Sequence, residues 1–460
     1  MARLEMLGGA CSLLVLGLCA GAGMAAELAP ARVFFVGKAG HVSPATGESR
    51  EYKLWRLIPV SQTRYLALLD KGVVKFKENR PGPRERVVAP APVVREEGLL
   101  VAMLNKEGKV LLESPLFPHS PKAVVPGAWQ HSQLVVMEEE SACPYGLLHR
   151  GAVELHCFDW QLQPLGKHPV PLESFWAAEA VVGLGRPEVW VFGEWEGPKV
   201  LREGKASPSS VDGFRPESQG TVVLRLVPAT GEAVPLRDVA GQVRRQAAAF
   251  FRQQLGAEKQ LVGLRFDPLR STSGAPAVGG VELLVTATWK ESGHWSGEFA
   301  GGKSFFLARL GPEGVSRWRR LALQFLQEPE REELEVGPEP GVVRVPGVSW
   351  FRDVGGFALG GGRVALVFLT LMAPEGLEQA RREGSAVAGV LALCDPSGCE
   401  LFTDIKGKAF ELSTEEVKVL GTPILLGPFG RSQLAFAARC VSKRDRELLG
   451  TCAAVLELRP

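Results

Sequence analysis

Short apolar or alternating runs separated by Gly, Pro or Asp turns dominate this chain. The runs are five to nine residues long and rich in Val and Phe, which is typical of β-strands. The clearest runs are residues 32–36, 99–104, 133–137, 188–192, 221–227, 281–289, 304–310 and 363–369. The pattern therefore predicts an all-β fold.

A degenerate unit recurs along these runs: a strand, a turn containing Asp, Pro or Gly, and a second strand. It occurs around residues 69–72, 104–108, 158–161, 227–231, 310–314 and 394–398. Recurring antiparallel sheets of this kind indicate a β-propeller-like ring of four-stranded blades. Six internal turns and one shared blade predict about seven blades.

The two ends of the chain fit a closed ring. The chain ends in a strand-like run at residues 453–458, and the run at 32–36 could complete that last blade. Closure of this kind removes exposed sheet edges. Two or three β-sandwich domains are the alternative, because they would give the same strand pattern.

One helical insertion is predicted near residues 238–255. Asp238 can cap it, and Gly256 can end it. Val239, Val243 and Ala247, followed by Phe250, Phe251 and Leu255, then share one face of the helix. We expect this face to pack onto the β domain; the alternative is a surface that binds a partner.

Residues 1–25 have the features of a secretory signal peptide. A short start is followed by an apolar stretch and by small residues that permit cleavage after Ala25, or alternatively after Ala22. Residues 26–460 then form a single β-propeller-like domain, which we expect to be periplasmic or secreted. A lipoprotein attached through Cys19 is an alternative, and a start at Met24 would remove the signal.

Six cysteines remain after cleavage, and they fall into three couples that are close in sequence. The couples are Cys143 with Cys157, Cys394 with Cys399, and Cys440 with Cys452. Each spacing suits the two arms of a hairpin, so the sequence predicts three local disulfides and an oxidising compartment.

Charge and hydropathy limit the partners. The formal net charge is only +2 and no basic stripe is present, which argues against nucleic acid as a partner. No apolar run after the signal is long enough to span a membrane. We expect a monomer that binds an envelope protein, a peptide or a glycan.

The segment 297–304, GEFAGGKS, matches the phosphate-loop pattern letter for letter. A phosphate loop needs a helix after it, but residues 305–310 have the pattern of a strand and run into Gly311. We therefore expect a Gly-rich hairpin loop here and no nucleotide.

Five histidines lie between His119 and His168, and Cys143 and Cys157 share this region. No close pair of ligands has the spacing of a zinc site. We therefore predict no metal and no cofactor.

Aromatic residues beside carboxylates form the candidate ligand surface. The residues concerned are Trp190, Trp195, Trp289, His294 and Trp295. Exposed indoles offer flat apolar contact to sugars or peptides. The alternative is that they fill the cores of the blades.

Two functional hypotheses follow. The first is an exported binding or scaffold protein that presents loops on a rigid β ring, because no catalytic motif is found. The alternative is an envelope hydrolase that acts on sugars or lactones, with carboxylates or a metal at the mouth of the propeller. We favour the first, so we expect no enzymatic activity.

Overall fold

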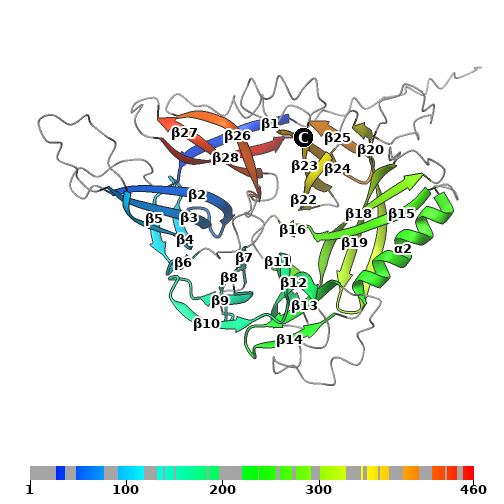
Figure 1. Ribbon diagram of the computed structural model, residues 1–460, viewed down its shortest axis with the longest axis horizontal. Coiled ribbons are helices and arrows are strands. Elements are labelled where there is room, and N and C mark those ends of the chain that lie inside the picture. Colours follow the sequence, from blue (N-terminus) through cyan, green and yellow to red (C-terminus); the bar gives the residue numbers. More distant parts are fainter. Residues whose placement is uncertain are drawn as a thin grey trace, which may run out of the picture.

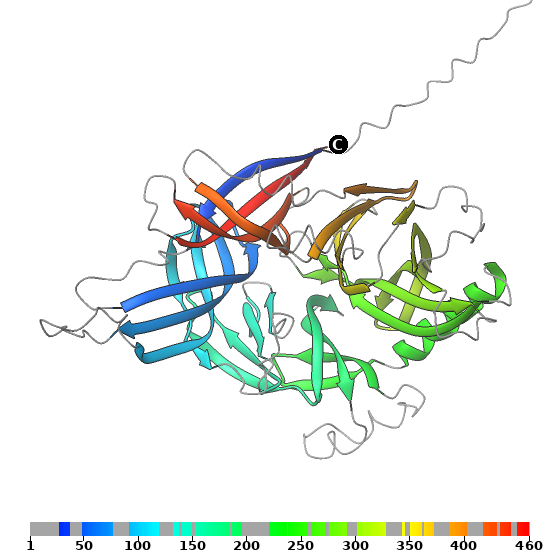
Figure 2. The same cartoon turned by 45° about the horizontal axis from the view of Figure 1, so that its top comes forward.

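The described part of the chain forms six β-sheets arranged around a ring, as Figures 1 and 2 show in the computed structural model. The predicted signal peptide, residues 1–25, lies outside the described residues. The structure describes residues 27–36, 48–76, 92–118, 132–137, 140–149, 152–183, 186–195, 220–236, 238–254, 259–271, 276–291, 301–327, 343–345, 350–360, 363–371, 387–402, 417–429, 433–442 and 449–459.

The first three sheets follow the chain in order. The first contains β2 (Glu48–Pro59), β3 (Arg64–Phe76), β4 (Pro92–Asn105) and β5 (Val110–Glu113), and β6 (Phe117–Pro118) also pairs with β4. The second contains β7 (Gln133–Val136), β8 (Tyr145–His149), β9 (Glu154–Phe158) and β10 (Pro164–Pro169). The third contains β11 (Ser174–Gly183), β12 (Arg186–Trp195), β13 (Gly220–Val227) and β14 (Glu232–Pro235), with β17 (Ala277–Val278) beside β11.

The remaining three sheets complete the ring. The fourth contains β15 (Lys259–Pro268), β18 (Val281–Glu291), β19 (Gly301–Gly311), β20 (Gly314–Gln327) and β21 (Val343–Val345). The fifth contains β22 (Trp350–Gly360), β23 (Arg363–Leu371), β24 (Val387–Cys394) and β25 (Cys399–Phe402), with β16 (Arg270–Ser271) beside β22. The sixth contains β26 (Val417–Pro428), β27 (Gln433–Ser442), β28 (Leu449–Arg459) and β1 (Glu27–Phe35).

The prediction of about seven blades is wrong. Five of the six sequence turns do connect two consecutive strands of one sheet, such as the turn at 104–108 between β4 and β5. The turn expected at 69–72 lies instead inside β3, which continues unbroken from Arg64 to Phe76. Asp70, Lys71 and Gly72 are paired there with residues of both β2 and β4, so this segment adds no sheet.

The predicted ring closure is confirmed. The first strand, β1, pairs antiparallel with the last strand, β28, from Glu27 with Arg459 to Phe35 with Cys452. The two ends of the described chain thus complete one sheet, and the outer edge of β28 is covered.

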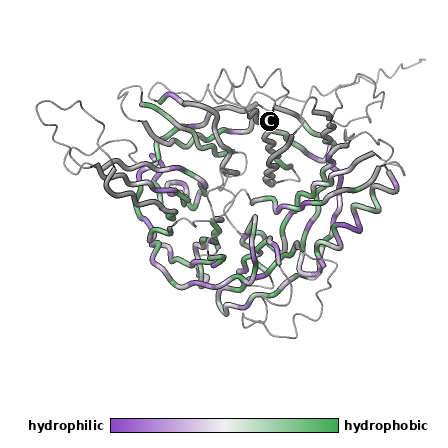
Figure 3. The backbone as a smooth tube through the Cα atoms, viewed as in Figure 1, coloured by the Kyte–Doolittle hydropathy of each residue, from purple (hydrophilic) through white to green (hydrophobic). Residues whose placement is uncertain are grey.

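The hydrophobic core is divided among the junctions between neighbouring sheets. Figure 3 shows the hydrophobic stretches along the strands around the ring. One buried cluster joins the first and second sheets, another the second and third, and so on to the cluster that joins the sixth sheet to the first. A β-sandwich has one core between two sheets, whereas here each sheet contributes to the cores on both of its faces. The propeller-like ring is therefore confirmed over the sandwich alternative.

The predicted insertion is α2 (Val239–Gln254), the one helix among the described residues. Val239, Val243 and Ala247 are buried in the core between the third and fourth sheets. The backbone carbonyl of Asp238 accepts the first helical hydrogen bond, from Gln242 N–H at 2.9 Å. The apolar face of the helix therefore packs on the β domain, as expected. By the criterion of length and hydropathy, no helix of the described chain could cross a membrane.

The connection between β15 and β18 was not anticipated. Its strand β16 pairs parallel with β22 of the fifth sheet, and its strand β17 pairs parallel with β11 of the third sheet. The connection from one sheet thus extends the innermost strands of both neighbouring sheets. Each strand has only two residues, which is too short for any periodicity in sequence.

The three predicted disulfides are confirmed. Cys394, at the end of β24, faces Cys399, at the start of β25, and the two are bonded. Cys143 is bonded to Cys157 on β9, and Cys440 on β27 to Cys452 on β28. Each bond closes a loop of 5 to 14 residues within one sheet, so the disulfides brace individual hairpins.

Candidate functional site

Two tryptophans of the candidate ligand surface belong to the core. Trp190 is fully buried and Trp289 is 3% exposed. The indole N–H of Trp190 donates to Glu188 Oε2 at 3.0 Å, and that of Trp289 donates to Ser304 Oγ at 3.2 Å. Neither ring is available to an external ligand, because each lies on a strand face that packs against a neighbouring sheet. His294, Trp295 and the side chain of Trp195 lie outside the described residues.

The phosphate-loop match does not form a phosphate site. Residues 301–304 are part of strand β19, not the hairpin loop that was expected, and residues 297–300 lie outside the described chain. Ser304 is buried and accepts the hydrogen bond from Trp289. Burial, followed by the nearby Arg265, lowers the pKa of Lys303. The residues match the phosphate-loop pattern, but they are followed by a strand and not by the helix whose N-terminus would bind the anion.

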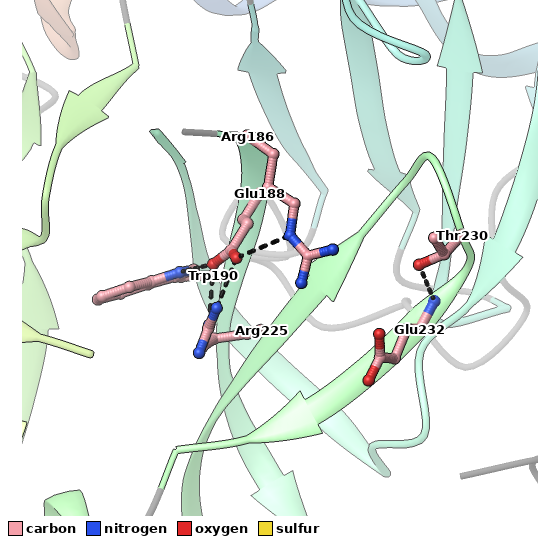
Figure 4. A network of polar contacts seen from close by, with 6 residues as sticks. All are labelled: Arg186, Glu188, Trp190, Arg225, Thr230 and Glu232. Atoms are coloured by element: carbon pink, nitrogen blue, oxygen red, sulfur yellow. Dashed lines mark hydrogen bonds and ion pairs between the residues drawn. The ribbon is translucent and has the colours of Figure 1, made fainter. Parts of the chain in front are cut away.

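The most elaborate polar network in the described ring surrounds Glu188 (Figure 4). Glu188 is fully buried. Arg225 donates to both of its carboxylate oxygens, through Nη2 and through Nε, the latter at 2.8 Å. Trp190 donates to the carboxylate as well, and Arg186 Nε lies 3.8 Å from Oε1. The carboxylate is thus held between two guanidinium groups and an indole.

Strand register explains why these residues meet. Arg225 on β13 lies directly opposite Trp190 on β12, and Glu188 precedes Trp190 by two residues, on the same face. That face packs against the fourth sheet. Sequence reasoning selected Trp190 but missed its charged partners, because the pairing of β12 with β13 spans 24 residues that carry no local signal.

The contacts around Glu188 favour its ionised carboxylate form. Burial alone raises the pKa of this carboxyl, but the hydrogen bonds from Arg225 and Trp190 outweigh it, and the pKa lies below its usual range. A carboxylate held ionised by a bidentate arginine cannot supply a proton as a general acid. The network therefore joins β12 to β13 within the third sheet, on the face that packs against the fourth sheet.

Two of the clustered histidines form a second polar group, at the junction of the first and second sheets. The ring of Phe117 on β6 lies 4.7 Å from His156 and 5.8 Å from His149, centroid to centroid. His156 Nε2 lies 3.6 Å from Glu154 Oε2, and Lys167 Nζ lies 3.0 Å from the same carboxylate. Burial lowers the pKa of His156; Glu154 opposes this effect, and His149 and Lys167 add to it.

No metal centre is formed by the described residues: no three His, Cys, Asp or Glu side chains are close enough to share an ion. His119 and His131 lie outside the described part of the chain. His168 belongs to β10, where burial lowers its pKa.

Exposed apolar side chains gather in one region of the ring. Six large hydrophobic residues are exposed among those described, and five of them lie on the outer strands of the first and second sheets or beside them. We name these five the outer apolar edge: Leu111 (45% exposed), Leu112 (37%), Leu116 (40%), Trp160 (52%) and Leu165 (53%). These residues were not predicted from the sequence, because an exposed edge strand can contain the same apolar residues as a buried strand.

Aromatic packing in the core joins the two sheets that carry the outer apolar edge. Leu116 directly precedes Phe117, and Trp160 follows Phe158 by two residues. The rings of Phe117 and Phe158 are 6.0 Å apart, centroid to centroid. In Figure 1, β5 and β6 lie on the same side of the ring as β9 and β10. The five residues are therefore the candidate binding site of the described chain.

Comparison with known proteins gives no family. No protein-family model matches the chain, and no curated protein matches it. Among solved structures, a protein of unknown function from Dyadobacter fermentans is 8% identical, with a TM-score of 0.25, over 94% of this chain and 99% of that chain.

Two enzymes are similar at the same low level. The β-1,2-mannobiose phosphorylase from Listeria innocua is 10% identical, with a TM-score of 0.28, over 90% of this chain and 92% of that chain. The α-L-arabinofuranosidase from Fusarium graminearum is 8% identical, with a TM-score of 0.29, over 93% of this chain and 98% of that chain. Similarity at this level assigns no function to the chain.

We predict that Arg225→Leu strongly destabilises the protein. It leaves Glu188 buried without its bidentate partner, which should lower the free energy of unfolding by about 3–5 kcal/mol. Arg309→Leu is the matched control, because the Arg309–Glu282 pair has a similar separation of 3.0 Å but is partly exposed. It should cost about 1 kcal/mol or less. Urea unfolding measures both; equal losses would contradict a structural role for the buried network.

We predict that His156 makes stability depend on pH. Its pKa is lowered on folding, so the unfolded chain takes up a proton first as the pH falls below about 6.5. The free energy of unfolding should therefore fall from about pH 7 to about pH 5, and His156→Gln should remove part of that fall. Urea midpoints across this range test the variant. An NMR titration of wild-type His156 at or above the usual value would refute the prediction.

Proposed function

We propose that this chain is an exported binding or scaffold protein of the cell envelope or extracellular space, and that it recruits a partner protein through the outer apolar edge. The observation that carries this proposal is the gathering of five of the six exposed large hydrophobic side chains on two neighbouring sheets. Exposed apolar side chains that gather in one region of a protein are typical of a site that binds another protein.

The local structure of β5 supports contact with a polypeptide. β5 is the last strand of its sheet and pairs with β4 from Ala102 to Leu104. Successive side chains of a strand point to opposite faces, yet Leu111 and Leu112 are both exposed. Such an apolar edge strand is a template for an added strand from another chain.

The chemistry of the edge favours protein over glycan. Four of its five members are leucines, which offer no hydrogen bonds to sugar hydroxyl groups. The neighbouring Glu113 is already engaged, because it accepts hydrogen bonds from Lys71 Nζ at 2.7 Å and from Tyr52 at 3.2 Å. An apolar segment of a partner protein matches this surface best.

The three disulfides support export. Each is local to one sheet, and disulfides persist mainly in secreted, periplasmic and extracellular proteins. Together with the signal-like segment 1–25, they form the basis for proposing an oxidising compartment.

Export has a direct test in the purified protein. We expect N-terminal sequencing of protein from its native compartment to begin near Ala26. We also expect a thiol titration of the denatured protein to find no free thiols before reduction and six after it, the six being the cysteines that follow Cys19. Free thiols before reduction together with an intact Met1 would exclude export.

The partner surface can be tested by photo-crosslinking in intact cells. A photoreactive amino acid at Leu112 or Trp160 should give the same discrete adduct with a partner protein, because both positions belong to one surface. Val278 is the matched control: it is 74% exposed but lies on β17, at the inner edge of the third sheet. An adduct of equal yield from Val278, or none from Leu112 and Trp160, would argue against this surface.

A further inference from the structure

The three disulfides differ in how far they are buried. Four of the six bonded cysteines are 0–1% exposed and form two fully buried bonds, Cys143 with Cys157 and Cys440 with Cys452. Cys394 is buried as well, at 1%, but its partner Cys399 is partly exposed. Cys399 is therefore the one cysteine of the described disulfides that is not buried.

The two buried bonds lie inside the cores between neighbouring sheets. Cys143 and Cys157 belong to the core between the second and third sheets. Cys440 and Cys452 belong to the core between the fifth and sixth sheets. A reagent from solution reaches these four sulfur atoms only when the sheets that cover them open.

The third bond lies at the tip of a hairpin. Cys394 ends β24 and Cys399 begins β25, and the two residues form the last pair of the ladder before the turn. The turn consists of residues 395–398, and residues 395–397 are exposed. Solvent therefore borders this bond along the turn while the ring stays folded.

The hairpin has contacts that do not depend on its disulfide. Asp395 Oδ1 accepts hydrogen bonds from Ser397 N–H at 2.7 Å, from Ser397 Oγ at 2.6 Å and from Gly398 N–H at 2.9 Å. The backbone N–H of Asp395 donates to the carbonyl of Gly398 at 2.8 Å. Three further residue pairs continue the ladder between β24 and β25. We therefore expect the hairpin to stay formed when the bond between its cysteines is opened.

We propose that the Cys394–Cys399 disulfide is a site of thiol modification, at which an external thiol opens the bond in the folded ring and becomes attached to Cys399. The external thiolate attacks Cys399 Sγ in line with the S–S bond, and a new S–S bond forms. The old bond breaks, and Cys394 Sγ leaves as a thiolate that takes a proton from water. The external sulfur is thus oxidised and Cys394 is reduced. A second thiol can then release Cys399 and leave as an external disulfide.

The modification concerns the outer part of the fifth sheet. β25 is the outermost strand of that sheet and contacts β20 and β21 of the fourth sheet. A group attached to Cys399 would therefore lie at the outer end of the junction between these two sheets. The outer apolar edge belongs to the first and second sheets, so the modification site does not depend on the partner surface proposed above.

The test is the order in which the three disulfides react in the purified, fully oxidised chain. The chain is treated with about 5 mM glutathione at about pH 8, where part of the reagent is thiolate, then quenched with acid and alkylated. Peptide mass spectrometry should find glutathione on Cys399 and a free thiol at Cys394. This reaction should be at least about tenfold faster than the loss of either buried bond, because those bonds require an opening of the ring.

Urea below the unfolding transition gives an internal control. It should accelerate the reaction of Cys143–Cys157 and of Cys440–Cys452, because it raises the population of open forms. The reaction of Cys394–Cys399 should be almost unchanged, since this bond is reached in the folded ring.

Two variants test which sulfur atom is attacked. Cys394→Ser leaves the thiol of Cys399, which should react with iodoacetamide at least about tenfold faster than the thiol of Cys394 in Cys399→Ser, because Cys394 is buried. Thermal unfolding should show that both variants are folded. If either variant is not folded, the mass spectrometry of the wild-type chain decides the question alone.

The outcomes also identify the kind of thiol. Reaction with glutathione supports modification by small thiols, and reaction only with reduced thioredoxin supports modification by a protein thiol. A mixed disulfide that forms first at any cysteine other than Cys399 would overturn the proposal. So would the absence of reaction with both reagents below the unfolding transition.

Discussion

Each sheet in this ring buries both of its faces only because it has a neighbour on either side, and the whole arrangement depends on the pairing of the first strand with the last. The junction between the sixth and first sheets shows how this closure is secured. Phe34 of β1 stacks with Tyr65 of β3, and Tyr65 also contacts Phe429 edge to face. The guanidinium of Arg32 lies 5.0 Å above the ring of Tyr65. Without β1, the edge of β28 and this cluster would be open to water.

The same packing explains where buried charge is tolerated. Glu188 lies in a junction lined by hydrophobic side chains, where an unpaired carboxylate would be very costly. Arg225 and Trp190 satisfy it from two adjacent strands, so the position requires a particular register of β12 and β13. The histidine pair at another junction has a weaker counterpart in Glu154. That junction is therefore the more sensitive of the two to protonation.

Because neighbouring sheets cover each other's faces, the outer strands, the inner edges and the connecting turns of the described chain are left for contact with other molecules. Two outer regions differ sharply in chemistry. The edge formed by β5, β6 and the β9–β10 hairpin is apolar, whereas α2 and β20 are rich in arginine.

The sequence by itself determined the strand content, the helix at Val239–Gln254 and the three disulfides, because each of these depends on local periodicity or on short spacing. The ring closure was inferred from strand-like runs at the two ends of the chain, but the pairing of β1 with β28 is a long-range contact. Only the tertiary structure decided the number of sheets, since 69–72 looks like a turn but pairs on both sides within β3. It also decided that Trp190 and Trp289 are buried and that Leu111 and Leu112 are exposed. The exposure of a side chain depends on which strand lies at the edge of a sheet, and that order is fixed by pairing between residues far apart in the chain.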